Sequence, residues 1–175
     1  MQQEVLSFWF DEIKPAQWWK KDPKFDQEIK DRFLNTHNKA NKGELYSWRS
    51  TPEGRLAEVI VLDQFSRNIY RDTPNSFASD TLALVLAQEA ISVKADHSLN
   101  DSMRSFLYMP FMHSESKVIH TVAAVLFKTQ DNYNFELRHK KIIDRFGRYP
   151  HRNAILGRIS TSDEIEFLQQ PGSSF

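Results

Sequence analysis

The chain has 175 residues, with 23 basic and 23 acidic side chains, six histidines and no cysteine. Without cysteine, disulfides, thiolate catalysis, zinc ribbons and iron–sulfur clusters are excluded, and a net charge of zero provides no overall field that would recruit nucleic acid or an anionic membrane. The longest apolar run, Val122 to Phe127, is too short to span a bilayer and the N-terminus lacks the basic region of a signal peptide, so we expect a soluble, cytoplasmic protein with no membrane partner.

The first strong helix signal begins at Asp22, which is followed directly by a proline. An aspartate at the N-cap and a proline at the first helical position together favour a helix start. Phe25, Ile29 and Phe33 then recur every four residues and predict one apolar stripe. Gly43 is expected to close this helix, because glycine tolerates the left-handed conformation of a C-terminal cap.

The stretch "TPEGRLAEVIVLDQFSRNIYR" repeats this pattern, with Thr51 as the N-cap and a proline after it. Pro74 is expected to end the segment. The residues predicted to face inward are Leu56, Val59, Ile60, Leu62, Phe65 and Ile69.

A further long helix is predicted in "SFASDTLALVLAQEAISVKA". The apolar positions assigned to its buried face are Leu82, Val85, Leu86, Ala90 and Val93.

Shorter helices are predicted over residues 101–108, 115–128 and 134–146. Pro110 should interrupt the first of them, and Ser114 is the predicted N-cap of the second.

A last helix is predicted to open at a capping box formed by Thr161 and Glu164. The few glycines and prolines lie between the predicted helices, and no 34-residue repeat is visible. We therefore expect an all-α protein with a single domain over residues 1–175, whose tail, residues 170–175, is frayed unless Phe175 docks.

The first candidate site is "LDQFSRNIYR", where Asp63, Arg67 and Arg71 share one helical face and Gln64 and Asn68 flank it. This face has two interpretations. It is either a solvated surface with one Asp–Arg pair, which is the favoured reading, or a ledge of hydrogen-bond donors in which Asp63 orients Arg67.

The second candidate site is "YMPFMHSES", in which His113 precedes a predicted helix start and Glu115 lies in its first turn. A histidine beside a helix cap is more often structural than catalytic. The sequence His-Ser-Glu resembles the H-x-E of zinc deaminases, but that site needs cysteine ligands. The histidines show no metal-ligand spacing and no phosphate or dinucleotide loop is present, so we expect neither a metal nor a cofactor.

The third candidate site is "RFGRYPHRNAILGR", residues 145–158, which contains four arginines, a histidine and no acidic residue. Pro150 can open a short helix, so His151 and Arg152 fall in a first turn, where the helix dipole disfavours cations. Several cations there require an anion. That anion is either a ligand carboxylate or phosphate, or an internal carboxylate. The internal candidates are Asp63, Glu115 and Asp144.

These three stretches, with "STSDE" after the last one, together resemble an uncharacterised, mostly bacterial family, domain of unknown function 924. "VLSFWF", "QWW", "FDQEIKDRF", "FASD" and the terminal "GSSF" fit it as well, so the resemblance covers essentially the whole chain. It implies a tetratricopeptide-like, right-handed superhelix of antiparallel helix pairs. It implies no activity and no catalytic residue. His120 stands where the family motif is expected to have glutamine, a difference that would affect ligand preference if that glutamine binds a ligand.

Two functions follow as hypotheses. The first is a pocket for a small anionic ligand (phosphate, carboxylate or nucleotide), in which His113 or Glu115 is the acid/base candidate if a reaction is catalysed. Its predicted ligand-binding residues are Arg67, Asn68, Arg71, Arg148, His151, Arg152 and Asn153.

The second hypothesis is a helical-repeat interaction module that binds an acidic peptide or a partner protein. Trp18, Trp19 and Trp48 could anchor such a partner, although tryptophans are more often buried. Nucleic-acid binding is disfavoured by the net charge of zero. The residues select no reaction and no oligomeric state.

Overall fold

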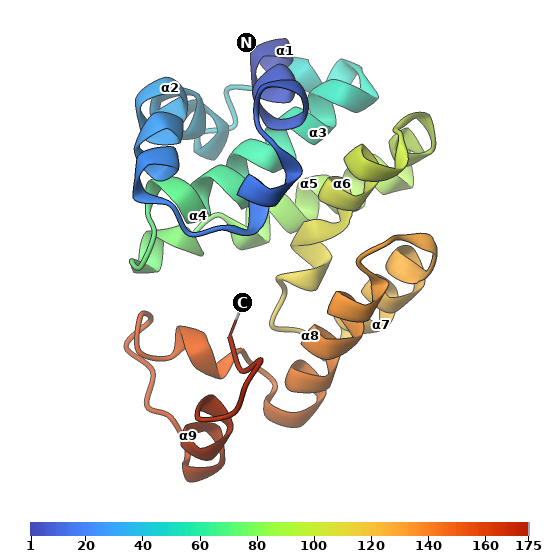
Figure 1. Ribbon diagram of the computed structural model, residues 1–175. Helices are drawn as coiled ribbons and strands as arrows, with labels where there is room; N and C mark the ends of the chain where they lie inside the picture. Colours follow the sequence, from blue (N-terminus) through green and yellow to red (C-terminus); the bar gives the residue numbers. More distant parts are fainter. Residues whose placement is uncertain (175) are drawn as a thin grey trace. The chain divides into compact units, whose positions relative to one another are not determined.

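The computed structural model describes residues 1–174, and Phe175 lies outside the described residues. This part of the chain is all-helical, as the sequence predicted (Figure 1). The α-helices are α1 (Gln2–Ser7), α2 (Pro23–Asn41), α3 (Pro52–Ile60), α4 (Ser66–Ile69), α5 (Asp80–Ser92), α6 (Asp101–Met112), α7 (Lys117–Leu126), α8 (Tyr133–Phe146) and α9 (Ser162–Leu168). None of the described helices combines the length and the apolarity that crossing a lipid bilayer requires.

The described chain forms two compact units. The first unit comprises Met1–Arg71 and Asn75–Pro110, and the second comprises Asp72–Pro74 and the chain from Phe111 onward. Their boundary falls inside α6, at Pro110. The sequence placed the end of this helix at residue 108, which is wrong: α6 continues to Met112 and contains the proline. A proline removes one helical hydrogen bond without preventing the turns that follow, and the two residues after it are buried.

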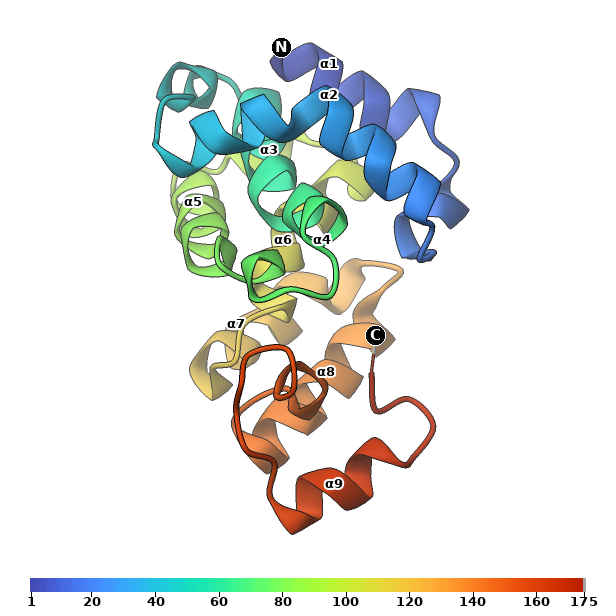
Figure 2. The same ribbon diagram turned by 90° about the vertical axis from the view of Figure 1, so that its left-hand side faces the viewer.

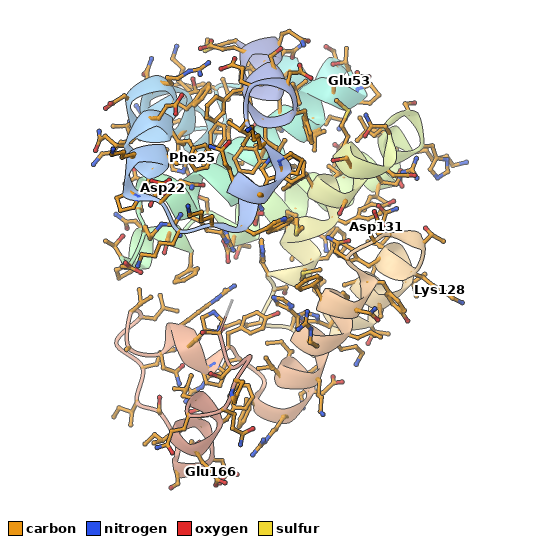
Figure 3. All side chains as sticks on the ribbon, in the orientation of Figure 1. Asp22, Phe25, Glu53, Lys128, Asp131 and Glu166 are labelled. Carbon is orange, nitrogen blue, oxygen red and sulfur yellow. The ribbon has the colours of Figure 1, made fainter. Side chains whose placement is uncertain are left out.

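The two predicted helix starts of the first unit are confirmed. The Asp22 carboxylate accepts a hydrogen bond from the backbone N–H of Lys24 at 3.0 Å, at the start of α2 (Figure 3). The Thr51 hydroxyl accepts from the backbone N–H of Gly54 at 3.1 Å, at the start of α3. Gly43 has a φ of +71° directly after α2, where the sequence predicted a left-handed cap.

Aromatic rings fill the core of the first unit. The Phe8 ring lies 5.1 Å from the Phe33 ring, and Phe33 lies 4.8 Å from Phe65. These rings come from the N-terminal segment, from α2 and from the segment between α3 and α4, so the core joins three parts of the chain. α2 packs against α4, as Figure 2 shows. The N-terminal helix α1 and the π-helical turn Phe8–Glu12 after it were not among the predicted elements.

A second π-helical turn, Val61–Phe65, connects α3 to α4. All six residues that the sequence assigned to the inward face of this region are buried. The favoured reading of its other face as solvated is wrong for Asp63, which has an exposed fraction of 0%. α2 and α5 both pack against this turn and cover it, whereas Arg67 and Arg71 farther along keep part of their surface exposed.

Helix α5 buries only part of the predicted face. Ala90 is completely buried as predicted, but Val85 and Val93 are exposed, and Ala83 and Ala87, which were not assigned to this face, are completely buried. α5 packs against α3, and small buried side chains allow close approach of neighbouring helices. Leu86 is the large apolar residue that both the prediction and the structure bury.

In the second unit, Ser116 is the N-cap residue of α7, and its hydroxyl accepts from the backbone N–H of Ile119 at 3.4 Å. The prediction of Ser114 as the cap is therefore wrong. α8 ends at Phe146, as the predicted range 134–146 implied, and Gly147 after it has a φ of +70°. The capping box of α9 is confirmed, because the Thr161 backbone N–H donates to the Glu164 carboxylate at 2.8 Å and the Glu164 N–H donates to the Thr161 hydroxyl. The buried residues Ile142, Ile143 and Tyr149 form an apolar core with Phe146 and Phe167.

Candidate functional site

The ledge of the first unit is made of ion pairs. Arg67 donates to both carboxylate oxygens of Asp80, at 3.0 and 3.1 Å, and to the backbone carbonyl of Asp63 at 2.6 Å. Its guanidinium also lies 3.3 Å from the Asp63 carboxylate. Asp63 therefore does orient Arg67, but inside the protein and with a second carboxylate.

The other two ledge residues share one carboxylate on α2. Arg71 donates to Asp26 Oδ1 at 2.7 Å, and the Asn68 amide donates to the same oxygen at 2.8 Å. Asp26 lies 45 positions before Arg71, so this contact ties the end of α4 to the start of α2. Arg67, Asn68 and Arg71 thus have acidic partners within their own unit.

In the second unit, Arg148 is paired with Glu164. Its guanidinium donates to the two carboxylate oxygens at 2.7 and 2.8 Å and to the Ile159 carbonyl at 2.9 Å. The hydrogen bond from Arg148 lowers the pKa of Glu164 to about 2. Asn153 also donates to Glu164, at 3.3 Å, and to the Ser160 hydroxyl at 3.0 Å.

Glu115 supplies an internal anion for the basic segment. Arg158 donates to its two carboxylate oxygens at 2.5 and 2.9 Å, and the backbone N–H of Tyr149 donates to it at 2.7 Å. Burial raises the pKa of Glu115, but the hydrogen bonds from Arg158 and Tyr149 outweigh it and the pKa falls below its ordinary value. Of the other two carboxylates considered for this role, Asp63 contacts Arg67 and Asp144 accepts from Lys140 at 2.6 Å.

Arg152 and His151 lie around the ring of Tyr149. The Arg152 guanidinium stands over this ring at 4.6 Å and donates to the His113 carbonyl at 3.1 Å. The His151 ring lies 5.6 Å from the Tyr149 ring. Pro150–Arg152 is a single 3-10 turn, so a helical turn opens at Pro150 as predicted but extends over three residues only.

Beneath this cluster, His120 and Glu136 form a completely buried pair. His120 Nδ1 lies 2.8 Å from Glu136 Oε1, and its Nε2 lies 2.8 Å from the Ser114 carbonyl, to which it can only donate. Burial raises the pKa of Glu136, and the hydrogen bond to His120 opposes this shift. Tyr149 contacts the same imidazole, with its hydroxyl 3.1 Å from Nε2.

The predicted site residues thus fall into two groups. Arg67, Asn68 and Arg71 belong to the first unit. The second unit holds His113, Glu115, Arg148, His151, Arg152 and Asn153, which lie around Tyr149 and Glu164. A single pocket formed by both groups stays a prediction.

The first unit contains an open cavity of about 410 Å³, at the C-terminal end of α2. The described residues that line it are His37, Asn38, Asn41, Lys42, Tyr70, Asn75, Ala78 and Ser79. Among these side chains one is an ammonium group and none is a carboxylate. Three are carboxamides and two are hydroxyls.

A hydrogen-bonded chain fixes one wall of this cavity. The Ser66 hydroxyl donates to the Leu62 carbonyl at 2.6 Å, so its oxygen must accept the hydrogen bond from His37 Nε2 at 2.7 Å. His37 therefore carries its proton on Nε2. Its Nδ1 is left as an acceptor, 3.3 Å from the Asn41 amide, whose oxygen accepts from the Ser79 hydroxyl at 2.8 Å. Burial lowers the pKa of His37 to about 4, so the ring is neutral at pH 7.

The N-terminus of α5 and the C-terminus of α2 both lie at the cavity. Ser79 is the N-cap residue of α5, and its hydroxyl is directed to Asn41, so the cap makes no side-chain hydrogen bond to the helix. Because Ser79 lines the cavity, the N-terminus of α5 lies at its edge, with the Asp80 carboxylate in the first turn of the helix. At the end of α2, backbone N–H groups of Gly43 and Glu44 already satisfy the carbonyls of Ala40 and Lys39, at 2.9 and 3.0 Å.

Sequence reasoning did not single out this cavity. The one signal available was His37, which continues the four-residue spacing of Phe25, Ile29 and Phe33 with a polar ring. Histidine on an apolar stripe requires a buried partner, and Ser66 provides it from 29 positions away. In residues 1–174 no group of three or more His, Asp or Glu side chains is arranged to hold a metal ion.

These features define an all-helical protein with a polar, acid-free cavity in one of two compact units. A family profile described as bacterial protein of unknown function, DUF924, matches residues 5–172, and the chain belongs to this family. The solved structure of a protein of unknown function from Agrobacterium tumefaciens is similar to it, with a TM-score of 0.92, 36% sequence identity and 96% of each chain covered. No curated protein matches the chain.

Proposed function

We propose that the protein binds a small anionic molecule that also carries hydroxyl groups, in the cavity at the end of α2. The observation that carries this proposal is the composition of the lining: Lys42 is present and no described lining residue is acidic. A volume of about 410 Å³ lies in the ordinary range for sites that hold small molecules.

The wall made by His37, Asn41 and Ser79 supports recognition of hydroxyl groups. These side chains hold one another in a fixed arrangement before any ligand arrives, so little conformational entropy is lost on binding. The Asn38 and Asn75 amides can both donate and accept hydrogen bonds. The Tyr70 hydroxyl, which also lines the cavity, can donate and accept as well. Binding rather than catalysis is proposed, because a histidine with a pKa of about 4 is a weak base at pH 7.

Titration calorimetry with inorganic phosphate, a hexose phosphate, the matching free hexose and a nucleoside monophosphate tests the proposal. We expect the hexose phosphate to bind better than phosphate or the free hexose. Lys42→Ala should weaken binding about 10- to 100-fold, since one charge-assisted hydrogen bond is lost. Lys30→Ala, an exposed lysine on the same helix outside the cavity, is the matched control. Equal affinities in the two variants, or no binding by any of these compounds, would contradict the proposal.

The arginines take a structural role in this proposal. Arg67, Arg71 and Arg148 already donate to Asp80, Asp26 and Glu164. The remaining predicted anion site, around Arg152 in the second unit, is tested in the same titrations with Arg152→Glu. Loss of hexose phosphate binding in this variant, with binding retained in Lys42→Ala, would place the ligand there instead.

A helical-repeat interaction module with a tetratricopeptide-like arrangement is the second candidate function. Val118, Val122 and Val125 are exposed and are spaced by four and three residues, so they lie in one row along α7. Such a row suits the apolar face of an amphipathic partner helix. Binding of an acidic amphipathic peptide that is lost in Val122→Glu and retained in Lys42→Ala would favour this function over the cavity.

A further inference from the structure

A second surface of the first unit combines an exposed aromatic ring with positive charge. The Trp19 segment, "KPAQWWKKDPK" from Lys14 to Lys24, contains four lysines and one aspartate. The Asp22 carboxylate caps α2, where Figure 3 labels it. Although the whole chain has a net charge of zero, this segment is locally basic.

Trp19 is exposed to an unusual degree for its size, with an exposed fraction of 63%. Its ring is nevertheless supported from below. It stacks on Phe106 with an interplanar angle of 9° and 6.0 Å between ring centroids, and the Trp18 ring meets it edge-on.

Trp18 in turn anchors this arrangement. Its indole N–H donates to the Trp9 carbonyl at 2.9 Å, and its ring packs edge-on against Phe106 at 4.8 Å. The exposed ring is therefore held in a fixed orientation by its neighbours. A fixed aromatic surface loses little conformational entropy when a planar partner stacks on it.

We propose that the Trp19 segment binds single-stranded nucleic acid, with one base stacked on Trp19 and phosphates held by Lys14, Lys20 and Lys24. An exposed ring within a lysine-rich segment combines the stacking surface and the positive charge that single-strand binding proteins use without sequence preference. Carboxylates of an acidic peptide would match the lysines but would gain nothing from the electron-rich ring face. The 3-10 turn Pro15–Trp19 is too short to lay an apolar helical face in a lipid surface.

The test is fluorescence anisotropy with a labelled 12-nucleotide oligo-uridine, using the full chain at 50 and 200 mM salt. Three lysine–phosphate contacts predict a slope of about −2 for log affinity against log salt. Trp19→Ala should weaken binding about 5- to 100-fold, the loss expected for one stacked base. Trp19→Phe, which keeps a smaller ring, should fall between the parent and Trp19→Ala.

Two controls separate stacking from charge. Tyr46→Ala removes an exposed ring elsewhere in the same unit and should leave the affinity unchanged. An abasic strand of the same length keeps the phosphates and should bind about as weakly to the parent as oligo-uridine binds to Trp19→Ala.

Absence of binding at 50 mM salt, equal affinity of the abasic strand, or equal affinity of Trp19→Ala would overturn the proposal. Tighter binding of poly-glutamate, or of vesicles containing phosphatidylserine, would overturn it in favour of those partners. Circular dichroism of each variant confirms that the helical fold is retained.

Discussion

The guanidinium of Arg71 donates to the carboxylate of Asp26, which lies 45 positions earlier in the chain, with Nη2 at 2.7 Å from Oδ1. Asn68 donates to the same oxygen. One carboxylate on α2 therefore holds two residues of α4 and of the turn after it.

Replacing this carboxylate should destabilise the first unit. Asp26→Asn leaves a partly buried guanidinium without its anion, and we expect the free energy of unfolding in urea to fall by about 1–3 kcal/mol. Asp31→Asn changes an exposed aspartate on the same helix and should cost less than 0.5 kcal/mol, about the usual limit for surface positions. Equal losses in the two variants would mean that the Asp26 contacts contribute nothing specific.

Gly54 in α3 should not accept a side chain. A Cβ atom there would overlap the backbone carbonyl oxygen of Trp48. Glycine to alanine inside a helix ordinarily stabilises by about 0.5–1 kcal/mol, but here we expect Gly54→Ala to destabilise. Thermal unfolding followed by circular dichroism shows whether Gly54→Ala raises or lowers the stability. A higher melting temperature would show that Trp48 can move aside.

The buried His37 should make stability depend on pH. Its pKa is about 4 in the folded chain and 6.5 without burial, so the unfolded chain binds more protons between these values. The stability that the protein gains by burying the neutral His37 ring is fully present above pH 6.5 and is lost as the pH falls toward 4. His37→Asn should therefore lose less stability than the parent between pH 7 and 5, by on the order of 2 kcal/mol. His97→Asn, an exposed histidine in the same unit, should behave as the parent.

Glu136 should make stability depend on pH in the direction opposite to His37. Its folded pKa is raised above 4.5 by burial, and its Oε2 atom is buried without a hydrogen bond. The unfolded chain therefore loses its proton first, and stability declines as the pH rises above 4.5. His120 and Lys140 face this carboxyl group, together with Asp144.

Glu136→Gln should remove this decline, because the amide can donate to His120 Nδ1 without a charge. Chemical denaturation at pH 4.5 and 7 measures the difference, with Asp163→Asn as an exposed control. A steeper decline in Glu136→Gln than in the parent would contradict the assignment.

Glu164 should protect the second unit against acid. Its pKa is about 2, held there first by the hydrogen bond from Arg148, against 4.5 without these contacts. The stability it contributes is complete above pH 4.5 and is lost as the pH falls toward 2. Glu164→Gln keeps an acceptor for the capping box but removes the charge that pairs with Arg148, so it should lower stability at pH 7 by about 1 kcal/mol and flatten the acid dependence. Glu166→Gln on the same helix serves as the control (Figure 3).

The parts of the fold that could be predicted are those set by residues close together in the chain. Asp22, Thr51 and Thr161 cap helices through backbone groups within three positions, so their sequence context suffices. The burial of Asp63 could not be predicted in this way. Periodicity identifies one apolar face, but it does not show that α2 and α5 also cover the polar one.

The candidate site was less predictable than the fold for the same reason. The arginine partners Asp26, Asp80 and Glu164 lie 13 to 45 positions from Arg71, Arg67 and Arg148. The cavity brings together His37, Tyr70 and Ser79 from three separate segments. No spacing rule connects such residues until the helices have packed.

Glu164 both completes the capping box of α9 and pairs with Arg148, and the second contact depends on the order in which the chain is synthesised. Arg148 acquires its counter-ion only when a residue 16 positions later has left the ribosome. During translation, chain segments fold in the order in which they emerge. The nascent second unit consequently lacks this ion pair until Glu164 has been added, a stage at which every residue of the first unit has already been synthesised.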